Sequence, residues 1–67
     1  MPIAHIYVWT GFSNDAKKKV IAGITKVFTA MDIPIEAVEI VIHEIPKENW
    51  GVSGKQASEK FKQVEIP

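Results

Sequence analysis

The chain has 67 residues, and its composition excludes several ways in which so short a fold can be stabilised or used. It contains no Cys, which excludes disulfides and thiolate metal ligands, and its two His are too few for a convincing metal site. The net charge is zero, with eight Lys, eight acidic residues and no Arg, so there is no basic patch and nucleic acid is disfavoured as a partner.

Membrane and secretion signals are also missing from the sequence. No apolar run approaches the roughly 20 residues that a membrane span needs. The N-terminus has neither the charged region nor the cleavage site of a signal peptide, so we expect a cytoplasmic protein. A chain of this length buries only about 60% of its unfolded surface. With disulfides and metal excluded, oligomerisation is the remaining source of stability.

The first predicted element is a strand over residues 3–9, IAHIYVW, which is rich in β-branched and aromatic residues. Alternation divides it into one face of Ala4, Ile6 and Val8 and a second face of Ile3, His5, Tyr7 and Trp9. Both faces are largely apolar, so we expect the strand to be covered on both sides.

A helix is predicted next, from a turn at residues 10–13 to about Met31. Ser13 is the expected N-cap, and Pro34 prevents the helix from continuing. The apolar stripe at helical spacing comprises Ala16, Val20, Ile21, Ile24, Val27, Phe28 and Met31. Residues 17–19, three consecutive Lys, are expected to form a solvated face.

The second strand lies within residues 35–45, so the order strand, helix, strand predicts a right-handed βαβ unit with parallel strands. Residues 46–55 are expected to form a loop or short hairpin with positive φ at Gly51 and Gly54. The polar arm over residues 57–66 is expected to be a short helical turn or a strand added to a neighbour. The fold class is therefore α/β (α+β), as a single domain over residues 1–67. A two-stranded sheet with one helix is too small to be stable alone, so we expect a second copy of the chain to cover it.

Pro2 raises a chemical possibility. If Met1 is removed, the nitrogen of Pro2 becomes a secondary amine, whose ordinary pKa is about 8. Burial lowers that pKa towards neutrality, where an amine acts as a general base beside a carbonyl. If Met1 stays, the nitrogen is an amide and there is no base.

The order of several short motifs resembles the small tautomerase superfamily, and within it the 4-oxalocrotonate tautomerase pattern. The matching residues are Pro2-Ile3-Ala4, Gly11, Ser13, Pro34, Ile42-His43-Glu44 and the loop Trp50-Gly51-Val52-Ser53-Gly54. The resemblance implies a βαβ unit that dimerises into a four-stranded sheet and assembles as a hexamer, a trimer of dimers. It also implies that Pro2 is the general base in keto–enol tautomerisation of a 2-hydroxydienoate, with no cofactor and no metal.

The chain departs from the family pattern at two positions. Phe12 stands where the family has an arginine that binds substrate carboxylate, and Glu39 aligns with a second arginine that polarises the carbonyl oxygen. The resemblance places Trp50 and Val52 in the pocket and aligns Trp9 with an aliphatic wall residue. Substrate-binding residues are therefore expected at Trp9, Phe12, Glu39, Trp50 and Val52, with a small-molecule enol more apolar or aromatic than a muconate.

Several alternatives remain open at this point. Pro2 is also an acceptable first residue of a strand, and both Trp residues are common packing or interface residues. The two missing arginines favour a tautomerase-fold oligomer without this activity, or a hetero-oligomer whose second chain supplies them. A hydratase or dehalogenase in which Glu39 activates water is a weaker hypothesis. His5 and His43 are expected to be hydrogen-bonded structural residues.

Overall fold

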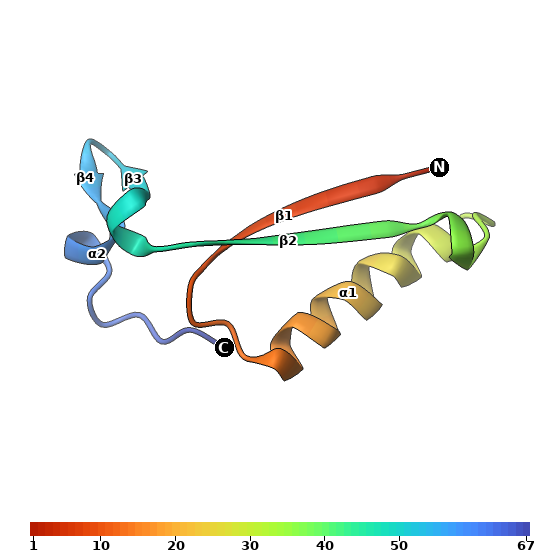
Figure 1. Ribbon diagram of the computed structural model, residues 1–67, viewed down its shortest axis with the longest axis horizontal. Coiled ribbons are helices and arrows are strands. Elements are labelled where there is room, and N and C mark those ends of the chain that lie inside the picture. The colour runs from red at the N-terminus through yellow and green to blue at the C-terminus, as the bar shows by residue number, and fades with distance from the viewer.

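The computed structural model describes all of residues 1–67 and contains the predicted βαβ unit (Figure 1). Strand β1 (Ile3–Trp9) leads to helix α1 (Asn14–Thr29), and the chain returns through the short 3-10 helix η1 (Ile35–Ala37) to strand β2 (Glu39–Ile45). β1 and β2 pair in parallel, with Ile3 opposite Glu39 and Trp9 opposite Ile45. The predicted fold class and the parallel pairing are confirmed.

A compact hairpin follows β2 at the end of the sheet away from the N-terminus (Figure 1). It consists of the 3-10 helix η2 (Lys47–Asn49), strands β3 (Gly51–Val52) and β4 (Lys55–Gln56), and helix α2 (Ala57–Lys60). The predicted positive φ at Gly54 is confirmed at 79°, but the prediction for Gly51 is wrong, and Ser53 has the other positive φ, 54°. The reason is that a two-residue hairpin loop needs left-handed backbone at its own central positions, which here are 53 and 54.

Helix α1 begins as predicted and ends earlier than predicted. The Ser13 hydroxyl accepts a hydrogen bond from the backbone N–H of Ala16 at 3.0 Å, so the predicted N-cap is confirmed. The helix ends at Thr29 rather than near Met31. Asp32 adopts a left-handed φ of 64°, and the following N–H returns to the carbonyl of Phe28, which closes the last turn and reverses the chain.

One face of the sheet packs against α1 (Figure 1). Its half-buried residues are Ala4, Ile6 and Val8 of β1, Ile40 and Ile42 of β2, and Ala16, Val20, Ile24 and Phe28 of α1. The predicted apolar stripe is therefore too wide, because two strands cover only a narrow strip of the helix and leave Ile21, Val27 and Met31 exposed.

The expectation that residues 17–19 form a solvated face is wrong for the first of them. The Nζ of Lys17 lies 3.0 Å from a carboxylate oxygen of Glu44 on β2, with both side chains about one third exposed. Lys18 and Lys19 are exposed, as predicted. Lys17 therefore ties the start of α1 to the far end of the sheet.

The opposite face of the sheet, which we call the open face, has no covering element within the protomer except at its Trp9 end, where Trp50 and Phe61 contact Trp9. Its residues are Ile3, His5, Tyr7 and Trp9 of β1 and Glu39, Val41, His43 and Ile45 of β2. Ile3 and Tyr7 are 55% and 56% exposed, and Ala57 is the only fully buried residue of the chain. The accessible surface is 4937 Å², whereas a compact monomer of this mass would expose about 4,250 Å². The expectation that both faces are covered is thus not met by one protomer. Neither helix is long and apolar enough to cross a membrane.

Candidate active site

An apolar cavity lies where β1 leads into the β1–α1 turn, at the end of the sheet that carries the hairpin. Its volume is about 310 Å³, and seven of its nine lining residues are hydrophobic. The lining residues are Tyr7, Val8, Trp9, Phe12, Trp50, Val64, Glu65, Ile66 and Pro67. Three of the expected substrate-binding residues, Trp9, Phe12 and Trp50, therefore meet in one cavity.

The indole of Trp9 is held on several sides. It meets Trp50 edge-on, with ring centroids 6.0 Å apart, and lies 5.5 Å from the ring of Phe61. The ammonium of Lys47 sits 4.9 Å from the centre of the Trp9 ring and donates a hydrogen bond to the carbonyl of Phe61. The Nε1–H of Trp9 is buried and has no acceptor. This packing fixes the wall that Trp9 presents to the cavity, since a ring contacted on several sides has few alternative positions.

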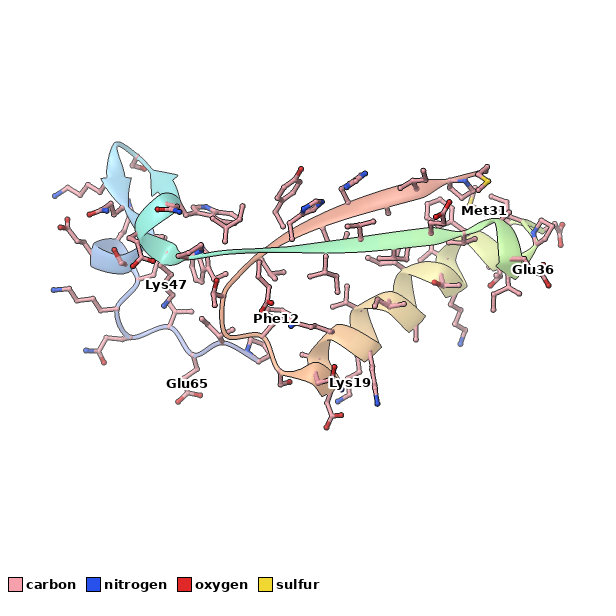
Figure 2. The ribbon with its side chains drawn as sticks, viewed as in Figure 1. Phe12, Lys19, Met31, Glu36, Lys47 and Glu65 are labelled. Atoms are coloured by element: carbon pink, nitrogen blue, oxygen red, sulfur yellow. The ribbon has the colours of Figure 1, made fainter.

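The opposite wall of the cavity is formed by the segment Val64–Pro67, which we call the tail. After α2 the chain runs back beneath the loop that carries Phe12, and Figure 2 shows Phe12 and Glu65 on these two segments. The backbone N–H of Ser13 donates to the carbonyl oxygen of Pro67 at 3.3 Å. The predicted short helical turn is confirmed at α2, but the sequence reasoning missed all four tail residues, because it treated residues 57–66 only as a helical turn or a strand added to a neighbour.

Gly11 provides the space in which the tail lies. Its φ is 119°, a conformation that L side chains rarely adopt, and a Cβ at this position would lie 3.3 Å from Cδ1 of Ile66. Any side chain here would press on Ile66 as well as strain the backbone. Gly11, which precedes α1, is therefore the residue at which Ile66 of the tail contacts the β1–α1 turn.

Pro2 and Glu39 lie at the other end of the sheet. The backbone N–H of Glu39 donates to the carbonyl of Pro2 at 3.1 Å, and Glu39 pairs in register with Ile3. Because Trp9 is seven residues further along an extended strand, about 23 Å separate it from Pro2. Figure 1 shows the N-terminus and the hairpin at opposite ends of the sheet. A single protomer therefore does not bring Pro2 to the cavity.

Val52 is the remaining expected site residue. It lies in β3 opposite Lys55, is half-buried, and does not line the cavity.

The two histidines form a pair in the middle of the open face. Nδ1 of His5 and Nε2 of His43 are 2.8 Å apart, and the Tyr7 ring stacks on His43 with centroids 4.5 Å apart. The prediction of hydrogen-bonded histidines is confirmed. No three His, Asp or Glu side chains lie close enough together to hold a metal ion.

Comparisons with known proteins agree with this architecture. The family model described as "Tautomerase enzyme" matches residues 2–60. A 2-hydroxymuconate tautomerase from Comamonas testosteroni is 43% identical over 60 residues, which are 88% of this chain and 95% of the relative.

Solved structures of 4-oxalocrotonate tautomerases have the same fold as this chain. A 4-oxalocrotonate tautomerase isozyme from Methylibium petroleiphilum superposes with a TM-score of 0.80 at 40% identity, covering 85% of this chain and 94% of that one. A heterohexameric 4-oxalocrotonate tautomerase from Chloroflexus aurantiacus gives a TM-score of 0.81 at 27% identity, covering 88% and 97%. With the βαβ fold and the family match over residues 2–60, this chain belongs to the tautomerase family and is an isomerase of the 4-oxalocrotonate tautomerase type.

Proposed function

We propose that this isomerase interconverts the enol and keto forms of a 2-hydroxydienoate or aryl enol, with Pro2 as its general base once Met1 is removed. The observation that carries the proposal is the family match, which begins at Pro2 itself. The half-buried position of Pro2 directly before β1 supports it, because partial burial disfavours the charged form of an amine.

The distance between Pro2 and the cavity supports a site shared between copies of the chain. A two-fold axis that joins two β1 edges makes the strands antiparallel and extends the sheet to four strands. With full overlap of the two strands, the partner's Ile3 lies opposite Trp9, and the partner's Pro2 reaches Thr10. Within one protomer Pro2 and Trp9 are about 23 Å apart, whereas the partner's Pro2 would lie roughly one strand spacing, 4.8 Å, from the Trp9 end of β1. Pairing through β2 edges would leave three strand spacings between them, so the β1 edge suits the chemistry better.

The open face favours a further level of assembly. Ile3, Tyr7 and Val41 are exposed in the protomer, and a homohexamer of three dimers would cover them. The His5–His43 pair, in which His5 is exposed and His43 is half-buried in the protomer, would then be enclosed with its hydrogen bond already made.

The reaction moves one proton from oxygen to carbon. The amine of Pro2 removes the proton of the enol hydroxyl, the C=O bond forms as the electron pair of the C=C bond moves to carbon, and the protonated amine returns the proton to that carbon. Trp9, Phe12 and Trp50 hold the apolar part of the substrate in the cavity, and we expect Val52, which lies outside the cavity of one protomer, to contact substrate in the assembled site. The hydroxyl of Tyr7, a residue that lines the cavity, is a donor for the developing negative oxygen, in place of the missing arginines. Glu39, beside Pro2, repels a carboxylate placed at that end of the sheet.

The experiment begins with the intact mass of untagged protein, which shows whether Met1 has been removed. Enol-to-keto conversion is then followed by ultraviolet absorbance for the wild type and Pro2→Ala, with sedimentation to verify the assembly of both. We expect Pro2→Ala to lose activity at least about 100-fold while the oligomer survives, because the primary amine of an N-terminal Ala is not held in place by the proline ring. Undiminished turnover by an assembled Pro2→Ala variant would remove Pro2 from the mechanism.

The absence of Arg in the chain favours a second candidate, an oligomer of this fold without the chemistry. The heterohexameric relative from Chloroflexus aurantiacus suggests a related case, in which a second chain type supplies the missing cations. A chain that has lost Met1, assembles alone and yet converts no enol would support one of these two. Activity gained on mixing with a second tautomerase chain would identify the hetero-oligomer.

A further inference from the structure

The cavity beside Trp9 contains no positive charge. Among its lining residues Glu65 has the only charged side chain, and that charge is negative. The ammonium of Lys47, which is not a lining residue, packs against the Trp9 ring and donates to the carbonyl of Phe61. The cavity is therefore unsuited to a carboxylate, which would lose its water without gaining an opposite charge.

The tail that carries Glu65 is held in place by two independent contacts. Ile66 packs into the space left by Gly11, and the carbonyl of Pro67 accepts from the N–H of Ser13. Both contacts are made to the turn that positions Phe12. The tail also lies beyond residues 2–60, which the family model covers, so this wall is a feature of the present chain rather than of the matched region.

We propose that this cavity binds the end of the substrate remote from the reacting carbon, and that Phe12 and the tail make it select an uncharged aryl group over a second carboxylate. The inference rests on the proposed function, and it adds the substrate class and a specificity-determining segment. The aromatic rings of Trp9, Phe12 and Trp50 give a flat apolar group edge and face contacts. A volume of about 310 Å³ lies at the lower end of the range for small-molecule sites.

Binding of non-reacting ligands tests the selectivity without requiring turnover. Trp9 and Trp50 are the only two Trp residues of the chain and both line the cavity, so intrinsic fluorescence reports its occupancy. The assembled wild-type protein is titrated with 3-phenylpropanoate, which has one carboxylate and a phenyl group, and with adipate, which has two carboxylates. We expect 3-phenylpropanoate to bind at least about tenfold more tightly, which corresponds to roughly 1.4 kcal/mol. Equal affinity, or tighter binding of adipate, would overturn the proposal.

Three variants and one matched control assign the selectivity to residues. Phe12→Arg introduces the missing cation and should shift the preference towards adipate by about tenfold or more. Glu65→Gln should strengthen adipate binding about threefold and leave 3-phenylpropanoate binding unchanged. The change removes only the repulsion between the Glu65 carboxylate, which is exposed, and the second carboxylate of adipate. Ile66→Ala should weaken 3-phenylpropanoate binding about threefold by opening the wall. Glu59→Gln makes the same charge change on exposed α2, outside the cavity, and should change neither affinity.

Failure of this inference and failure of the proposed function give different results. If Pro2→Ala abolishes turnover but neither Phe12→Arg nor Glu65→Gln alters the ligand preference, the cavity does not set specificity and the role of Pro2 stands. If the ligand preference follows the variants while an assembled Pro2→Ala protein still converts enols, the general base is wrong. Selectivity that follows the variants, together with faster turnover of the enol of phenylpyruvate than of 2-hydroxymuconate, supports both.

Discussion

The substitution Val41→Lys tests whether the open face is an interface between copies of the chain. Val41 lies in the middle of β2, opposite His5, and is 39% exposed in the protomer. Across the register, Val41 faces His5 and its neighbours Ile3 and Tyr7, none of which is acidic; the one carboxylate nearby on the open face is Glu39, two residues away on β2 itself. If two open faces meet, an ammonium placed there would be enclosed with only Glu39, along its own strand, as a nearby counter-charge.

The size of the effect follows from the cost of a poorly paired charge in an interface. Removing one partner of a buried ion pair costs about 3–5 kcal/mol, and the long stem of Lys lets its head reach towards water, so the lower value applies. An interface between two open faces carries the change twice, which gives about 6 kcal/mol. That raises its Kd by roughly 10⁴-fold.

The assay is sedimentation velocity over a wide range of protein concentration. The control is Val27→Lys, the same replacement at a residue of α1 that is 59% exposed and remote from the open face. We expect Val41→Lys to dissociate at concentrations where the wild type and Val27→Lys remain assembled. If Val41→Lys sediments like the wild type at every concentration, the open face is not an interface, and the reasoning from its exposed side chains fails.

Three further predictions concern the stability of the fold and are checked by urea denaturation at a fixed protein concentration. Glu44→Gln should lower the free energy of unfolding by at most about 1 kcal/mol, because both members of its 3.0 Å ion pair with Lys17 are partly exposed; a larger loss would mean that assembly buries the pair. Ser13→Ala should cost about 1 kcal/mol through loss of the α1 cap to the N–H of Ala16, and an unchanged midpoint would show that the tail alone secures this turn. Ser53→Asn should stabilise the hairpin by a few tenths of a kcal/mol, since Asn accepts the left-handed φ of 54° better than Ser, and a destabilised variant would argue against the hairpin geometry.

Much of the scaffold could be predicted from the sequence because it depends on residues close together in the chain. Alternation of apolar residues located β1, and helical spacing with the Ser13 cap located α1. The single connection through one helix then made parallel pairing of the two strands the expected topology. The positions of Trp9, Phe12 and Trp50 in one cavity followed from resemblance to the family rather than from periodicity.

Tertiary structure alone decided the contacts between residues far apart in the chain. Lys17 forms an ion pair with Glu44, and Ile66 packs against Gly11. Neither contact is indicated by the sequence pattern around the two residues that make it. The second wall of the cavity exists only because α2 ends at Lys60 and the chain turns back. The distance from Pro2 to the cavity, which makes a second copy necessary for the proposed site, is likewise a consequence of an extended strand. Local preferences act between neighbours before the chain folds, whereas a binding surface exists only after distant segments have packed together.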